Sequence, residues 1–177
     1  ELMVHQLRVA TGRQQPRLED GPSFFVLQNK MRNQVRGKAM ALDNIGDAKD
    51  QLSVAEAGLL RLEDLHSQMR DLMVRGANDT LNAEQRDDIN REIRSLAMAM
   101  DEIVGRTQFN ETGKLLDGTF KATYLVGPNE SDTLAVTIGN FDSESLGVKV
   151  EDANVLSSDN ARKGLNRVDH AINRLKD

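Results

Sequence analysis

The feature that most constrains the fold is a long run without proline, in which apolar residues recur at steps of three and four. No proline occurs between Phe24 and Ala77. From Ile45 onward two interleaved series each repeat every seven positions: Ile45, Leu52, Leu59, His66 and Met73, and Ala48, Ala55, Leu62 and Met69. Such spacing places the residues in a seam along one side of an α-helix. The pattern predicts one helix of about 50 residues, about 75 Å long at about 1.5 Å per residue.

A second helix is predicted after the short segment 76–82. Asn82 is a good N-cap residue, and Gln85 stands where its side chain can return to the cap backbone. Apolar residues then step by four and three: Ile89, Ile93, Leu96, Met100 and Ile103. Because the connection is short, the two helices must run antiparallel.

The period changes to two after residue 118, which predicts a β-hairpin. Its two arms are Phe120–Val126 and Leu134–Ile138, joined by the turn residues 127–131. A further short strand is expected over 147–150. A last helix begins near Ser157 and carries Leu165, Val168, Ile172 and Leu175 on one face. The first dozen residues fit the end of a fourth helix.

The expected fold class is mainly α: an elongated bundle of three to four long antiparallel helices with an appended β-hairpin. We expect one domain over 1–177, made of an N-terminal region 1–118, a β-hairpin region 119–150 and a C-terminal helix 157–177. Hydrophobic residues make up 38% of the chain but aromatic residues only 3%, a composition that suits helix-on-helix packing. The chain begins and ends in mid-pattern, so we expect a fragment of a longer protein.

Composition argues against several classes of partner. The net charge is −5, and no basic cluster could follow a phosphate backbone, so no nucleic acid partner is expected. No apolar run is long enough to span a membrane, and residues 1–12 do not have the pattern of a signal peptide, so neither a membrane anchor nor classical secretion is expected. Cysteine is absent, which removes disulfides and thiolate metal sites.

No catalytic residue, metal site or cofactor site is expected. His5, His66 and His170 are far apart in the sequence, and no two have the spacing of a helical metal site. The carboxylate pairs Asp87-Asp88, Asp43 with Asp47 and Asp101-Glu102 have no convergent histidine, so a solvated helix face is the simpler interpretation. The sequence therefore indicates a protein that is not an enzyme.

Three motifs give the chain a family resemblance. They are MRDLMVRGAN at 69–78, a helix with Ile89 and Ile93, and TQFNETGKLLDG at 107–118. In this order, after a long heptad helix and before a hairpin and a last helix, they resemble bacterial flagellin over essentially the whole chain. The resemblance implies the core rod domain, without the terminal polymerisation helices. The short segment after Ile138 leaves no room for a hypervariable outer domain.

The resemblance implies a structural subunit of the flagellar filament, serving motility through self-assembly by helix packing. Its implied partners are other flagellin subunits, an export chaperone, the type III export apparatus and hook-associated proteins. The implied location is the extracellular flagellum, reached without a cleaved signal peptide.

The resemblance also implies a face that the innate immune system recognises through Toll-like receptor 5. The matching positions are Gln68, Arg70, Leu72 and Glu92. At the first of these the family pattern has an arginine. A neutral amide cannot replace a bidentate cation, so weakened receptor binding is expected.

Two other functions remain open. The hook–filament junction protein shares the helical framework, and GANDTLNAEQR at 76–86 suits it, whereas KLLDG at 114–118 favours flagellin. A non-flagellar coiled-coil interaction protein is the second alternative.

Overall fold

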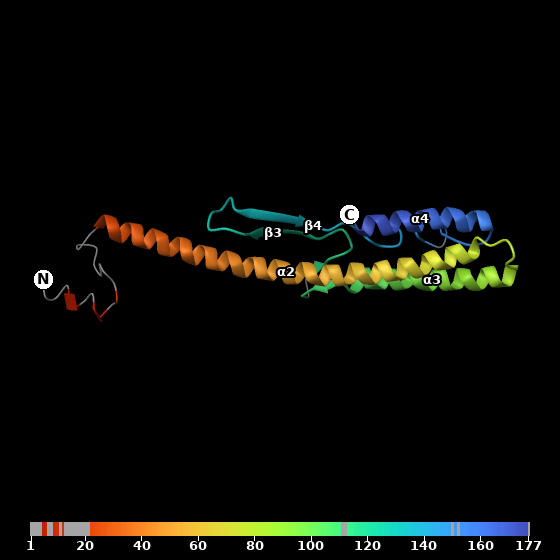
Figure 1. The fold of residues 1–177 in the computed structure, drawn as a ribbon, viewed down its shortest axis with the longest axis horizontal. Coiled ribbons are helices and arrows are strands. Elements are labelled where there is room, and N and C mark those ends of the chain that lie inside the picture. Colours follow the sequence, from red (N-terminus) through yellow and green to blue (C-terminus); the bar gives the residue numbers. More distant parts are fainter. Residues whose placement is uncertain are drawn as a thin grey trace. The chain divides into compact units, whose positions relative to one another are not determined.

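The computed structural model describes residues 5–6, 9–10, 12, 22–110, 113–149, 151 and 153–176. Within these ranges, the elements in chain order are α2 (Pro22–Gly76), α3 (Ala83–Arg106), β1 (Gln108–Phe109), β2 (Gly113–Lys114), β3 (Lys121–Leu125), β4 (Thr133–Thr137) and α4 (Ser158–Lys176) (Figure 1). Residues 5–6 and 9–10 are helical. Gly12 is in a turn, and the other residues of the predicted fourth helix lie outside the described residues.

The described chain is mainly helical, as predicted, and its strands form two small antiparallel pairs. β1 pairs with β2, with Gln108 opposite Lys114, and β3 pairs with β4 in the predicted hairpin. The predicted strand at 147–150 is wrong for residues 147–149, which form a turn and bend, and Val150 lies outside the described residues. The backbone N–H of Val148 donates to the carbonyl of Ser143 at 2.9 Å, so this segment closes on itself instead of pairing with a strand.

The chain divides into two compact units, which we describe separately. The first comprises Glu1–Asp47 with Tyr124–Leu134. Here the side-chain amide of Asn44 donates to the carbonyl of Leu125 at 3.0 Å. A Cβ placed on Gly37 would lie 3.0 Å from the Cβ of Pro128, so glycine permits this close approach.

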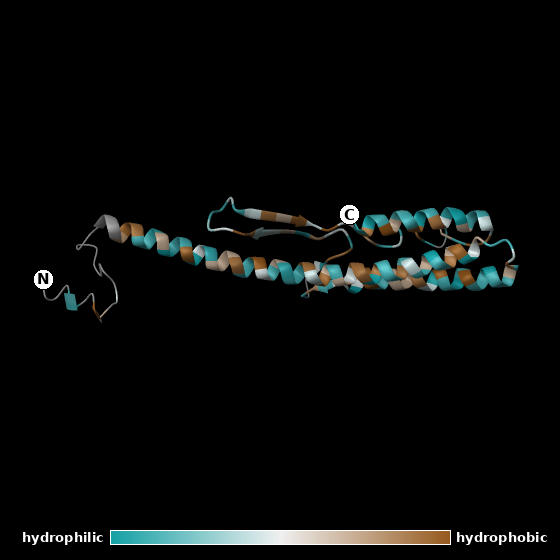
Figure 2. Ribbon diagram, viewed as in Figure 1, coloured by the Kyte–Doolittle hydropathy of each residue, from teal (hydrophilic) through white to brown (hydrophobic). Residues whose placement is uncertain are grey.

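In the same unit several large apolar side chains of α2 are exposed to solvent, and Figure 2 shows hydrophobic residues at intervals along this helix. Among the most exposed are Val35, Met40 and Leu42, at 66%, 61% and 68%. Ala41 is the buried exception among its apolar neighbours there. Ile45, the first residue of the predicted seam, is 41% exposed, so the prediction that it packs in a core is wrong within this unit.

The second unit comprises Ala48–Thr123 with Ala135–Asp177 and contains the main core. The predicted seam is buried here from Ala55 through Leu62, His66 and Met69 to Met73. Residues from α3 and α4 belong to the same core: Ile89, Ile93, Ala97, Met100, Val104, Ala161, Val168 and Ala171. Each large apolar side chain buried in this way contributes about 1.5–3 kcal/mol.

Leu52 belongs to this unit but is 38% exposed, against the prediction of a buried seam. Ala48 and Ala55 of the second series are buried on either side of it in the sequence, so the exposure of Leu52 follows its position around the helix. α3 ends at Arg106, and a Cβ on Gly58 would meet the Thr107 side chain at 2.9 Å, so α3 ends level with Gly58. α4 ends at Lys176, which pairs with Glu63. Leu52 lies beyond both helix ends.

No helix in the described ranges of the chain is both long and apolar enough to cross a membrane.

Candidate interaction surfaces of the second unit

The turn between α2 and α3 is stabilised by a capping box and by side-chain hydrogen bonds within the turn. The predicted capping box is confirmed: the backbone N–H of Gln85 donates to Asn82 Oδ1 at 2.8 Å, and the backbone N–H of Asn82 donates to Gln85 Oε1 at 3.1 Å. Asn78 Oδ1 accepts from the backbone N–H and the hydroxyl of Thr80. Such contacts satisfy backbone donors that a helix start and a tight turn leave free.

Arg86 ties this turn to the segment that precedes α4. Its guanidinium donates to the carbonyls of Gly76 at 2.9 Å, Asn78 at 2.9 Å and Val155 at 3.1 Å. Asn90 reinforces the connection, because its Oδ1 accepts from the backbone N–H of Val155 at 2.9 Å. A planar guanidinium with several donors suits such a cluster of carbonyl groups. The sequence pattern alone did not reveal this role of Arg86.

α4 packs on α2 through a close approach and two ion pairs. A Cβ on Gly164 would lie 2.7 Å from the sulfur of Met73, so the absence of a side chain lets the helices approach. Arg70 Nε lies 2.7 Å from Asp169 Oδ1, and Lys176 Nζ lies 3.1 Å from Glu63 Oε1. The contacts run in opposite chain directions, so α2 and α4 are antiparallel.

The four predicted receptor-contact residues do not form one cluster. Gln68 and Glu92 are exposed, and Leu72 is half-buried and packs against the core. Gln68 and Leu72 are four positions apart and share a side of α2. Arg70 is two positions from each, which turns it about 200° around the helix, and its side chain is engaged by Asp169 of α4.

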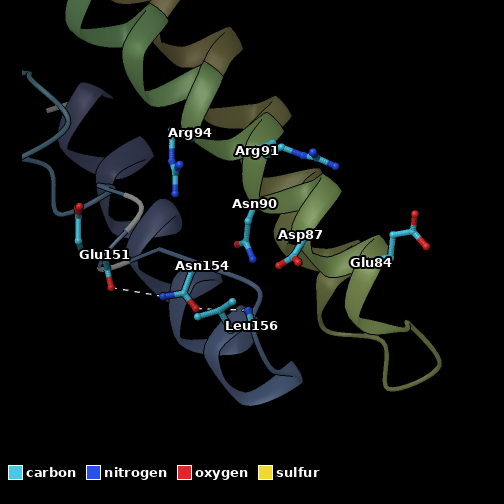
Figure 3. Close-up of a pocket in the computed structure, with 8 residues that line it drawn as sticks. All are labelled: Glu84, Asp87, Asn90, Arg91, Arg94, Glu151, Asn154 and Leu156. Atoms are coloured by element: carbon cyan, nitrogen blue, oxygen red, sulfur yellow. Dashed lines mark hydrogen bonds between the residues drawn. The ribbon is translucent and has the colours of Figure 1, made fainter.

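A polar groove that the sequence pattern did not reveal lies between α3 and the segment before α4. Figure 3 shows its lining: Glu84, Asp87, Asn90, Arg91 and Arg94 from α3, with Glu151, Asn154 and Leu156 from the segment. Its volume is about 810 Å³. The α3 residues recur at steps of about three, which is a visible stripe in the sequence. The opposite wall could not be predicted, because residues 151–156 have no periodic pattern.

Residues 107–110 and 113–118 connect the end of α3 to the core. Leu115 donates its backbone N–H to the carbonyl of Thr107 at 2.9 Å, and Leu115 and Leu116 are fully buried. Gly118 has φ +80°, and a Cβ there would lie 2.9 Å from Asn140, so glycine is required at this turn. The Thr119 hydroxyl and backbone N–H both donate to Asp117, and these bonds hold the pKa of Asp117 below its usual value.

The side chains considered for chemistry are dispersed. His5 and His170 are not in the core, whereas His66 is fully buried there. The carboxylate pairs point to separate partners: Asp88 contacts Arg91, Glu102 pairs with Arg106, and Asp101 accepts from Ser143. In the ranges that the structure describes, no group of three or more histidine, aspartate or glutamate side chains could hold a metal ion.

Comparison with known proteins identifies the family. Residues 1–121 match the family model described as the bacterial flagellin N-terminal helical region. The chain belongs to the bacterial flagellin family. Flagellin FlaB1 of Treponema pallidum is 28% identical over 183 residues, covering 95% of this chain and 64% of the relative. A flagellin of Bacillus subtilis is 29% identical over 161 residues, covering 84% of this chain and 53% of the relative.

Solved structures agree with the flagellin fold. The crystal structure of Bacillus cereus flagellin matches with a TM-score of 0.61 and 25% identity, over 74% of this chain and 75% of that one. A putative flagellar hook-associated protein from Vibrio parahaemolyticus matches with a TM-score of 0.67 over 90% of this chain and 85% of that one. At 19% identity the second likeness concerns the fold alone. This flagellin-family chain spans between about half and two thirds of the length of the two curated relatives.

Proposed function

We propose that the chain belongs to a structural subunit of the bacterial flagellar filament. The observation that carries the proposal is the flagellin match over residues 1–121, within which both long helices of the antiparallel pair lie. A structural subunit acts by packing against its neighbours. Within this chain, the apolar side chains of the second unit pack its helices together. No catalytic activity is included in the proposal.

Exposed apolar side chains of α2 support self-assembly. Val35, Met40 and Leu42 are each more than half exposed, and each would contribute about 1.5–3 kcal/mol if another helix covered it. Repeated contacts of this kind between identical subunits generate an open helical filament. We propose that residues 1–177 form the core rod domain, with the N-terminal region 1–118, the hairpin region 119–150 and the C-terminal helix 157–177.

The proposed partners follow from the same assignment. Other copies of the subunit pack beside it in the extracellular filament, and hook-associated proteins flank the filament. An export chaperone and the type III export apparatus deliver it without a cleaved signal peptide.

The assembly proposal is tested with the complete purified gene product. Under polymerising conditions, electron microscopy is expected to show helical filaments. A complete protein that remains monomeric under all these conditions would contradict the proposal and leave the non-flagellar coiled-coil alternative.

We also propose that this chain binds Toll-like receptor 5 more weakly than it would with arginine at position 68. Gln68 is exposed, so Gln68→Arg adds a bidentate cation without disturbing the core. We expect Gln68→Arg to bind the receptor ectodomain about tenfold more tightly, equivalent to about 1.4 kcal/mol. Asn173→Arg adds the same charge on α4 and serves as the control. Equal affinity of wild type and Gln68→Arg in surface plasmon resonance would end this proposal.

A further inference from the structure

His66 occupies a position in the core that a titratable side chain rarely occupies. It belongs to the predicted apolar seam and is fully buried between Leu62 and Met69 of the same helix face. Two ion pairs bracket it against α4: Glu63 with Lys176 on one side, and Arg70 with Asp169 on the other. The imidazole therefore lies inside the three-helix core and not at its edge.

The hydrogen bonds of His66 define one protonation state. Nδ1 lies 2.7 Å from the carbonyl oxygen of Leu62. Because a carbonyl only accepts, Nδ1 must carry the hydrogen, and Nε2 of the neutral ring then holds a lone pair. Nε2 is buried and has no hydrogen-bond partner. A lone pair without a partner is tolerable there, but an N–H of a cationic ring in the same place would be costly.

Three acidic groups on the helices that pack around His66 are engaged by other partners. On α2 and α4, Glu63 and Asp169 pair with Lys176 and Arg70. On α3, the carboxylate of Asp101 accepts from the backbone N–H and the hydroxyl of Ser143, at 2.8 and 2.9 Å. His170 of α4 is exposed. Among the described residues, no carboxylate accepts from Nε2 to stabilise a second proton.

We propose that His66 is an acid-sensitive lock, which keeps α2, α3 and α4 packed while its imidazole is neutral and loosens the core when Nε2 takes a proton. The inference concerns the folding of one chain, so it holds whether or not the filament proposal is correct.

The direction of the pH effect follows from burial. Desolvation lowers the pKa of His66 below the ordinary 6.5, and the bond to Leu62 opposes this only in part. The unfolded chain, with a pKa near 6.5, therefore binds the proton first as pH falls. The stability that depends on neutral His66 is complete above about pH 6.5 and is lost progressively between that pH and the lower pKa of the folded state.

The proposal is tested by thermal and urea unfolding of the 177-residue chain between pH 8 and pH 5, above the range in which most carboxylates titrate. The unfolding equilibrium constant of the wild type is expected to rise by up to about tenfold per pH unit below 6.5. His66→Leu should flatten this dependence, and His66→Gln should do so if the leucine variant does not fold. His170→Gln, which changes an exposed histidine, should behave as the wild type does.

A nuclear magnetic resonance titration of the imidazoles gives an independent measurement that needs no variant. His66 should remain neutral until the chain begins to unfold, because burial lowers its pKa. Two outcomes would overturn the proposal: a folded chain in which His66 titrates near 6.5, or His66 variants that lose stability in parallel with the wild type.

Discussion

Replacing Gly76 with alanine tests the packing at the end of α2. A Cβ at this position would lie 2.4 Å from Val155 Cγ1 and 2.7 Å from Val155 Cβ. Val155 cannot easily move away. Its side chain is fully buried, its N–H is bound by Asn90 and its carbonyl by Arg86. The contact includes Cβ, which is fixed to the backbone and not the end of a flexible chain.

The magnitude follows from two opposing effects. Overpacking a core by one methyl group costs about 1–3 kcal/mol, whereas replacing glycine in a helix gains at most about 1 kcal/mol, and less at its last residue. We expect Gly76→Ala to lower the free energy of unfolding by about 1–2 kcal/mol. For a chain of this size the melting temperature should fall by about 2–8 °C in circular dichroism.

Gly105→Ala is the matched control, because Gly105 also lies in the last turn of its helix but has no atom within 4 Å of the added Cβ. It should stabilise the chain by up to about 1 kcal/mol. In Gly76→Ala/Val155→Ala the contact with Cγ1 is removed and only the contact with Cβ remains, so the double variant should lose less than the sum of the single variants. A Gly76→Ala protein as stable as the wild type would refute the reasoning.

Three further changes test the second unit. Arg86→Met removes the donor to three carbonyls and should lower the free energy of unfolding in urea by about 2–3 kcal/mol. A loss below about 0.5 kcal/mol would show that these hydrogen bonds of Arg86 contribute little. Asp101→Asn weakens the charged bonds to Ser143 and should cost about 1 kcal/mol while increasing proteolysis near residue 143; unchanged cleavage would contradict this. Leu62→Ala opens a cavity in the core and should cost about 2–5 kcal/mol, whereas Leu60→Ala, at a side chain 57% exposed, should cost less than about 0.5 kcal/mol. Equal losses in the two leucine variants would contradict the assigned core.

Much of the second unit could be predicted because its signals are local. The Asn82 and Gln85 capping box depends on residues three positions apart, and the seam from Ala55 to Met73 depends on helix periodicity alone. The start of α4 also has a local cause: the hydroxyl of Ser157 accepts from the backbone N–H of Asn160 at 3.1 Å. Each signal lies within a few helical turns, so no tertiary contact is needed to interpret it.

The features that were missed depend on residues far apart in the sequence. Periodicity marks Ile45 and Leu52 as seam residues, but periodicity cannot show which of the two series is covered: both side chains are exposed, whereas Ala48 of the other series is buried. Arg86 and the polar groove both depend on the segment around Val155, which is 69 residues from Arg86 and has no periodic pattern. The four predicted receptor contacts come from a family motif. A motif does not show that the helix directs the Arg70 side chain toward Asp169 of α4.

The most direct test of the proposed function is to locate the protein on the cell. Antibodies against residues 1–177 are applied to intact flagella and to flagella of a strain from which the gene is deleted, and are detected by immunogold electron microscopy. A filament subunit predicts gold along the filament of the wild type and none in the deletion strain. Gold confined to the junction of hook and filament would contradict the account and identify a junction protein, and gold absent from flagella would exclude both.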